Sequence, residues 1–290
     1  MSSTIAEQLV NKTTFLVGNK KNAGKTTFLN YALKQIREVV SPTFFTIGID
    51  GETSDLIFDT PKPRVYTEIG DFVVTSDLMI NKSDALFEIM HVFPYKTVLG
   101  RLVLAKTLRS GTVELVGSED NKQLAEIVSY LKDEEHLETL IIDGAASRAT
   151  QVASIKNSNF YYLIKLDQRS INADINKFKT IALISKFKCI DTIEKVEEKL
   201  VFELKGALTE SKITQIPENC DVLLIDDFTK IFLTYSQIIE LQRKFEIAYK
   251  IPYKLNAFVV ILKDIIKEDF EKILEQHNIQ ENILFNPYEY

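Results

Sequence analysis

Residues 13–36 constrain the fold most, because a short apolar segment is followed by a glycine–lysine–threonine sequence and then by a helical pattern. The segment "TTFLVG" (13–18) predicts a buried strand. A strand, a tight turn of backbone N–H groups, a lysine and a hydroxyl residue that opens a helix together form a phosphate-binding loop. Gly24, Lys25 and Thr26 supply the last part of that pattern. Apolar residues then recur at helical spacing and predict a helix packed on a sheet: Phe28, Leu29, Ala32, Leu33 and Ile36.

The entrance of this loop departs from the usual G-x-x-x-x-G-K-[ST] pattern. Asn19 stands five residues before Gly24, and the nearest glycine is Gly18. Because asparagine tolerates left-handed backbone better than most residues, we expect Asn19 to take the place of the glycine. The alternative is a basic helix start without a ligand, but lysines at a helix N-terminus oppose the helix dipole. We therefore predict that ATP or GTP contacts Asn19, Lys20, Lys21, Asn22, Ala23, Gly24, Lys25, Thr26 and Thr27.

Lys20 has two interpretations. It precedes Lys25 by the spacing of the extra lysine in the K-x-x-x-G-K-T variant loop, where that lysine can reach phosphates of a neighbouring subunit. A solvated lysine is the alternative.

Asp143 is the main candidate for the acidic residue that a nucleotide-bound Mg²⁺ requires. It ends the apolar run "TLIID" (139–143), and such a residue at a strand's carboxyl end commonly helps to hold the metal ion. Asp226, in "VLLIDD", offers the same pattern as an alternative. Asp50 and Glu52, after the second strand, either face the metal ion and attacking water or belong to a plain turn. The predicted catalytic residues are Lys25, Asp50 and Asp143, and the predicted Mg²⁺ ligands are Thr26, Asp50 and Asp143.

Other motifs carry less weight. "NKSD" (81–84) matches the guanine-reading pattern but precedes Asp143 in the chain, which favours a chance match. Arg64 and Arg148 are candidates for stabilising charge on the phosphates. The histidines are scattered, and Cys189 and Cys220 have no metal-ligand spacing, so other catalytic chemistries find little support.

The remaining chain predicts an α/β fold with a β-rich insertion. A strand at 43–50 completes a strand–helix–strand unit, which implies parallel pairing. Residues 61–117 contain short strand-like runs without a convincing helix, with Gly70-Asp71 as a hairpin turn between the first two. We expect further helices at 121–131 with Asn121 as the cap, and at about 170–180, 235–249 and 265–277. Further strands are expected at 137–145, 159–165, 200–205, 221–226 and 255–262.

These elements predict a mainly parallel sheet of P-loop NTPase type flanked by helices. Residues 1–150 would form the nucleotide-binding region, including the insertion. Residues 151–290 would continue the α/β pattern, either in the same sheet or in a second unit.

The composition of the chain argues against some classes of binding partner. The chain has 290 residues and a net charge of −6, which argues against binding to nucleic acid or to an anionic membrane. No apolar run approaches the ~20 residues that a membrane-spanning helix needs. The N-terminal residues lack the pattern of a signal peptide. We therefore expect a cytoplasmic protein.

Several segments resemble one family of P-loop proteins: "VGNKKNAGKTTFLNYAL", "TIGIDGE", "TPKPRVY", "VELVGSEDN", "LIIDGAASR", "DDFTKIFL" and "NPYEY". This clostridial-type family is known as the reactivase subunit of adenosylcobalamin-dependent lysine 5,6-aminomutase, and has a MutS-like ATPase as partner. The loop is also similar to that of the molybdopterin-guanine-dinucleotide adaptor and dethiobiotin synthetase, in the dimer-activated class of NTPases. The resemblance implies that Lys25 and Thr26 contact phosphate and Mg²⁺, that Asp143 is the Walker-B-like acid, and that Asp50 faces water or metal.

The expected function is a Mg²⁺-dependent NTPase, with ATP as the expected nucleotide, that helps to reactivate an adenosylcobalamin-dependent aminomutase. The resemblance implies an aminomutase and a MutS-like ATPase as partners, and a homodimer or hetero-oligomer. One alternative is an ATP-dependent small-molecule kinase or ligase. The other is a nucleotide-binding module that does not hydrolyse.

Overall fold

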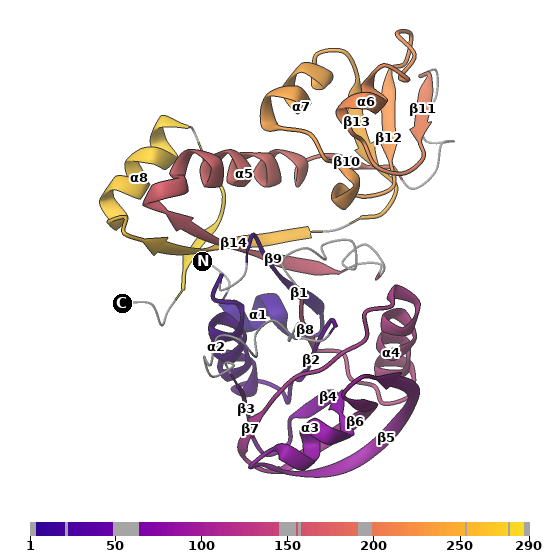
Figure 1. The fold of residues 1–290 in the computed structure, drawn as a ribbon, viewed down its shortest axis with the longest axis vertical. Coiled ribbons are helices and arrows are strands. Elements are labelled where there is room, and N and C mark those ends of the chain that lie inside the picture. Colours follow the sequence, from indigo (N-terminus) through magenta and orange to yellow (C-terminus); the bar gives the residue numbers. More distant parts are fainter. Residues whose placement is uncertain are drawn as a thin grey trace.

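The computed structural model describes residues 4–20, 23–48, 64–144, 155, 158–190, 199–252, 254–277 and 279–286. Within these ranges, nine strands form one sheet in the order β15-β14-β9-β1-β8-β2-β4-β6-β5 (Figure 1). The strands from β15 to β4 run parallel, and β6 is antiparallel to both β4 and β5. The strands are β1 Thr13–Gly18, β2 Thr43–Thr46, β4 Phe72–Ser76, β5 Leu86–Thr97, β6 Gly100–Arg109, β8 Leu140–Asp143, β9 Asn159–Asp167, β14 Lys254–Lys263 and β15 Ile283–Phe285.

Helices cover both faces of this sheet, because side chains alternate between the two faces along each strand. Leu16 of β1 lies in one buried cluster with Phe28 of α2. Phe15, its neighbour, lies in the opposite cluster with Leu124 of α4 and Phe178 of α5. The helices are α1 Ile5–Leu9, α2 Lys25–Arg37, α3 Asp77–Lys82, α4 Asn121–Asp133, α5 Ile171–Ile184, α6 Glu210–Ile213, α7 Tyr235–Gln242 and α8 Lys267–Gln276, with 3-10 turns η3 Gln168–Ser170 and η5 Phe228–Lys230.

A second, parallel sheet of four strands is inserted between α5 and β14. Its order is β10-β13-β12-β11, and its strands are β10 Lys188–Cys189, β11 Val201–Leu204, β12 Val222–Ile225 and β13 Glu246–Tyr249. Figure 1 shows α5 between the two sheets. The part of the chain after residue 150 therefore contributes β9, β14 and β15 to the large sheet and also builds the smaller one.

The predicted β-rich insertion extends the large sheet with antiparallel strands β6 and β5. Two details of that prediction are wrong. The segment contains a helix, α3, because the Ser76 hydroxyl accepts a hydrogen bond from the Met79 N–H and caps its start. Gly70-Asp71 does not join a hairpin, since β3 (Val65–Thr67) pairs with β7 (Gly111–Val113) whereas β4 pairs with β2 and β6.

Three other boundaries differ from the prediction. The helix expected at 235–249 ends at Gln242, and β13 follows, because its buried residues continue as a strand beside β12. The cap of α4 is Asp120, whose carboxylate accepts hydrogen bonds from two backbone N–H groups, and not Asn121. The strand expected at 43–50 ends at Thr46, and positions 49 and 50 lie outside the described residues.

The chain is thus an α/β protein with a large, mainly parallel sheet flanked by helices, which confirms the predicted fold class. In the described part of the chain, no helix combines the length and the apolar character that crossing a membrane would require.

Candidate functional site

The predicted phosphate-binding loop joins the carboxyl end of β1 to the start of α2. Lys25 is the first residue of α2, and Gly24 before it has left-handed backbone with φ of 69°. Within the described residues, no side chain caps this end of the helix, and its first turn contains no acidic residue. The free N–H groups and the positive end of the helix dipole are therefore available to an anion.

Lys25 folds back over the strand from which the loop leaves. A Cβ at Gly18 would lie 3.4 Å from Lys25 Cδ and 3.3 Å from the Cβ of Ala23, so the lysine stem and Ala23 both lie against the end of β1. Ala23 is buried, whereas Lys25, Thr26 and Thr27 are half-buried at the helix start. Lys21 and Asn22, which the sequence also assigns to the loop, lie outside the described residues.

Strands β14 and β15 fix the position of Gly24. The Asn286 side-chain amide donates a hydrogen bond to the Gly24 carbonyl at 3.2 Å, and the Asn286 N–H donates to the carbonyl of Val260. A Cβ at position 24 would lie 2.3 Å from Ile261 Cδ1 and 2.5 Å from Asn286 Nδ2. Glycine is thus required here both by the positive φ and by the space. Asn286 is only 3 % exposed, and sequence reasoning missed it because it lies far from the loop in the chain.

Asn19 works through its side chain, and the expectation of a left-handed backbone there is wrong. Its φ is not positive. The Asn19 N–H donates to the Leu163 carbonyl at 2.9 Å, its Oδ1 accepts from the Lys165 N–H at 3.1 Å, and its Nδ2 approaches the Lys165 carbonyl at 3.4 Å. The asparagine amide therefore continues the β1–β9 ladder by one further step after β1 has turned away.

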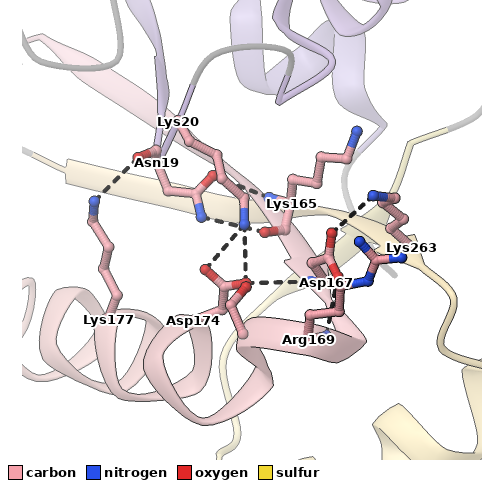
Figure 2. Close-up of polar contacts among 9 residues, drawn as sticks. Asn19, Lys20, Lys165, Asp167, Arg169, Asp174, Lys177 and Lys263 are labelled. Carbon is pink, nitrogen blue, oxygen red and sulfur yellow. Dashed lines mark hydrogen bonds and ion pairs between the residues drawn. The ribbon is translucent and has the colours of Figure 1, made fainter.

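Lys20 is bound to α5 (Figure 2). Its Nζ lies 3.0 Å and 3.2 Å from the two carboxylate oxygens of Asp174, which is 7 % exposed. The same carboxylate accepts hydrogen bonds from the Ser170 hydroxyl and the Asp167 N–H. Lys177, one turn further along α5, donates to the Asn19 carbonyl at 3.1 Å. The solvated-lysine interpretation of Lys20 is thus wrong in this structure, and reach towards a neighbouring subunit's phosphates stays a prediction.

Asp143 lies at the carboxyl end of β8, which pairs directly with β1. It is 3 % exposed, and its backbone carbonyl accepts hydrogen bonds from the Thr46 hydroxyl and the Ile47 N–H. Because both strands are parallel, Asp143 stands at the same sheet edge as the start of α2. Threonine and carboxylate oxygens are suitable ligands for Mg²⁺, so Thr26 and Asp143 fit the metal ion that a nucleotide would bring.

The end of β2 is also held at this edge, by the segment that follows β7. Gly48 donates to the Ser118 carbonyl at 3.0 Å and accepts from the Gly117 N–H at 2.8 Å. A Cβ at Gly117 would lie 1.7 Å from the Thr46 carbonyl oxygen, so only glycine allows this approach. Asp50 and Glu52, which follow in sequence, lie outside the described residues, as does Arg148.

Other sequence candidates lie elsewhere. Asp226 directly follows β12 of the smaller sheet, and its carboxylate pairs with Lys250 at 3.2 Å, so it is not an alternative acid beside β1. Arg64 lies 3.9 Å from Glu114, at the β3–β7 ribbon. Asp84 of "NKSD" accepts from the Thr112 N–H and hydroxyl, and these bonds lower the pKa of Asp84 below its ordinary value. That structural role agrees with a chance match to the guanine motif.

Within the described residues, no group of three or more histidine, cysteine or acidic side chains comes together to hold a metal ion. Comparisons of the chain with protein-family models, with curated proteins and with solved structures find no match. The likeness to the reactivase family therefore stays a prediction from the sequence motifs.

Proposed function

We propose that this chain binds the triphosphate of ATP or GTP, together with Mg²⁺, between the β1–α2 loop and Asp143, and hydrolyses it. The observation that carries this proposal is the junction at Gly24. A left-handed glycine, fixed by Ile261 and Asn286, leaves the start of α2 uncapped with Lys25 beside it. Such a junction suits an anion better than any other ligand.

The roles of the residues follow from their chemistry. The N–H groups of the first turn of α2 and the Lys25 ammonium would stabilise negative charge on the β- and γ-phosphates. The Thr26 hydroxyl and the Asp143 carboxylate would hold Mg²⁺, which neutralises further charge during hydrolysis. Most of the catalysis would then be positioning and electrostatic stabilisation by this chain.

The wider role rests on the motif resemblance. We propose that the chain acts as an accessory factor that reactivates an adenosylcobalamin-dependent aminomutase, with a MutS-like ATPase as partner. Analytical ultracentrifugation of this chain with the purified aminomutase and the MutS-like ATPase, in the presence of ATP, tests the proposed partnership by measuring whether the proteins associate. ATP turnover that responds to neither protein but to a small metabolite would contradict it.

Replacing Lys25 tests the nucleotide site. In isothermal titration calorimetry with Mg²⁺-ATP and Mg²⁺-GTP, Lys25→Ala should weaken binding at least tenfold, which corresponds to about 1.4 kcal/mol. The variant loses the ammonium that pairs with phosphate. Lys34→Ala is the matched control, because Lys34 lies exposed on the same helix two turns away. Equal affinity of the Lys25→Ala variant and the wild type would show that the site is misassigned.

Two further variants separate binding from hydrolysis. Thr26→Ala and Asp143→Asn should each make nucleotide binding less dependent on Mg²⁺. Each should also lower the rate of nucleotide hydrolysis by a larger factor than it lowers nucleotide affinity. Circular dichroism checks that both variants fold.

A further inference from the structure

Three contacts hold Asn19 and Lys20, the two residues at which the phosphate-binding loop leaves β1 and which we call the loop entrance. The Lys20 ammonium lies 3.0 Å and 3.2 Å from the two carboxylate oxygens of Asp174. The Lys177 ammonium donates to the Asn19 carbonyl at 3.1 Å, and the Asn19 side-chain amide bonds to the backbone of Lys165 in β9. Asp174 and Lys177 both belong to α5, so one helix holds both residues of the loop entrance (Figure 2).

The Asp174 carboxylate is also fixed by groups other than Lys20. It lies in the first turn of α5 and is 7 % exposed. It accepts hydrogen bonds from the Ser170 hydroxyl at 2.8 Å and from the Asp167 N–H at 3.2 Å. A buried carboxylate is costly unless a cation pairs with it, so the ion pair with Lys20 keeps both partners in place. Asp174 therefore offers the Lys20 ammonium one defined position.

Helix α5 is a firm support for these contacts because it packs on β14. The ring of Phe178 in α5 stacks on the ring of Phe258 in β14 with centroids 3.9 Å apart, and both side chains are fully buried. The other end of the loop lies against the same strand, since Ile261 of β14 is next to Gly24. Both ends of the loop are thus positioned relative to β14. Donors held in this way need little rearrangement when an anion arrives.

We propose that Asp174 and Lys177 are positioning residues for the nucleotide site, an inference that rests on the function proposed above. Asp174 acts through Lys20, and Lys177 acts through the Asn19 carbonyl. Together they hold the loop entrance in the conformation that receives the phosphates, and neither side chain needs to touch the nucleotide. Lys20 is then an anchor within its own chain and not a ligand for the phosphates of a neighbouring subunit.

The opposite role for Asp174 leads to an opposite prediction. If Lys20 were a phosphate ligand, Asp174 would hold its ammonium away from the nucleotide, and neutralising Asp174 would release the lysine and strengthen binding. If Lys20 is an anchor, neutralising Asp174 loosens the loop entrance and weakens binding. The sign of the change in nucleotide affinity therefore decides between the two roles.

Isothermal titration calorimetry with Mg²⁺-ATP and Mg²⁺-GTP measures this change. Asp174→Asn should weaken nucleotide binding roughly fivefold or more, because asparagine keeps the size of the side chain but loses the charge that holds Lys20. Glu246→Gln is the matched control, because it removes a carboxylate that pairs with two lysines of the smaller sheet region, away from the loop. The control should leave the affinity unchanged.

Lys177→Met tests the second contact from α5 without disturbing a buried group, because Lys177 is exposed. It should also weaken binding roughly fivefold or more. Lys179→Met is its matched control on the same helix, since the Lys179 ammonium lies over the Tyr235 ring at 4.3 Å and not at the loop. Circular dichroism checks the fold of each variant, and Lys177→Met decides the outcome if Asp174→Asn does not fold.

A double-mutant cycle separates positioning of the loop from a purely structural role of Asp174 within α5. The effect of Asp174→Asn on nucleotide affinity is measured in the wild type and in the Lys20→Met variant. If Asp174 acts through Lys20, the double variant should bind nucleotide no more weakly than the weaker-binding single variant. If Asp174 only stabilises the start of α5, the losses of affinity should multiply.

The proposal is overturned if Asp174→Asn binds nucleotide as tightly as the wild type or more tightly. It is equally overturned if the losses multiply in the double variant, or if Lys177→Met binds like Lys179→Met. A wild-type chain that binds neither Mg²⁺-ATP nor Mg²⁺-GTP would instead refute the nucleotide site itself, and the positioning role with it.

Discussion

At the scale of single residues, Asn19 explains why the loop lacks its usual glycine. The amide group bonds to both the N–H and the carbonyl of Lys165, and these groups would otherwise have lost their ladder partner where β1 ends. The residue was expected to act through its backbone, and it acts through its side chain. A glycine at this position would permit the turn but would leave β9 unpaired beside the loop.

Asn19→Gly should therefore destabilise the chain by about 1–2 kcal/mol, since it leaves a part-buried N–H without an acceptor and adds backbone freedom. Urea denaturation followed by circular dichroism gives the free energy of unfolding. Asn11→Gly is the matched control, because Asn11 has a φ of 55° and an exposed side chain. It should change stability by less than about 0.5 kcal/mol. Equal effects of the two variants would contradict the role given to the Asn19 amide.

At the scale of elements, the start of α2 is positioned by strands from the far end of the chain. Ile261 and Asn286 contact Gly24 from β14 and from the end of β15. The helix cannot move along its axis without disturbing this contact, so its N–H groups are held in one place. Pre-positioned donors of this kind need no rearrangement when an anion arrives.

Gly24→Ala should cost about 2–4 kcal/mol, because a left-handed alanine is strained and its methyl group overlaps Ile261 and Asn286. Nucleotide affinity should fall with stability. Gly206→Ala provides the control: its φ is 84°, but no atom lies within 4 Å of the added methyl group, so it should cost only about 1–2 kcal/mol. Thermal unfolding of both variants measures the difference in stability. Equal losses of stability would show that crowding at Gly24 adds nothing to the cost of the left-handed backbone.

Elements with strong local signals could be predicted from the sequence. The bounds of β1 match the prediction because its apolar run is buried on both faces, and α2 matches because its apolar residues repeat at helical spacing. The strand at 246–249 was missed because a helical pattern runs directly into it, and only pairing with β12 makes it a strand.

The candidate site was predictable only in part. Lys25, Thr26 and Asp143 follow local patterns, whereas Asn286, Lys165 and Asp174 reach the loop from distant segments. Their roles depend on the order of strands in the sheet, which no local pattern contains.

At the scale of the whole molecule, the two sheets share one buried core. Residues of the smaller sheet, Leu223 and Ile225 among them, belong to the same cluster as Phe178 of α5 and Phe160 of β9. The rings of Phe160 and Phe228 stack with centroids 5.1 Å apart. The Tyr249 hydroxyl donates to the Ile184 carbonyl at the end of α5. We therefore expect the two sheets to unfold together.

Phe228→Ala should destabilise the chain by about 3–5 kcal/mol, because it removes a ring that is 3 % exposed and leaves a cavity between the sheets. Phe232→Ala, four residues further along the chain at a side chain that is 66 % exposed, should have little effect. Differential scanning calorimetry should give one transition for the wild type and the control. Two separate transitions in the wild type would contradict a shared core.

The contact between Asn286 and Gly24 joins positions 262 residues apart. During synthesis on the ribosome, the glycine–lysine–threonine segment emerges before β14 and β15, which carry the groups that fix it. A nascent chain that stopped within the smaller sheet would contain the whole motif without Ile261 or Asn286. If the loop binds a nucleotide as proposed, we therefore expect binding only after the chain has been translated through Asn286 and this contact has folded.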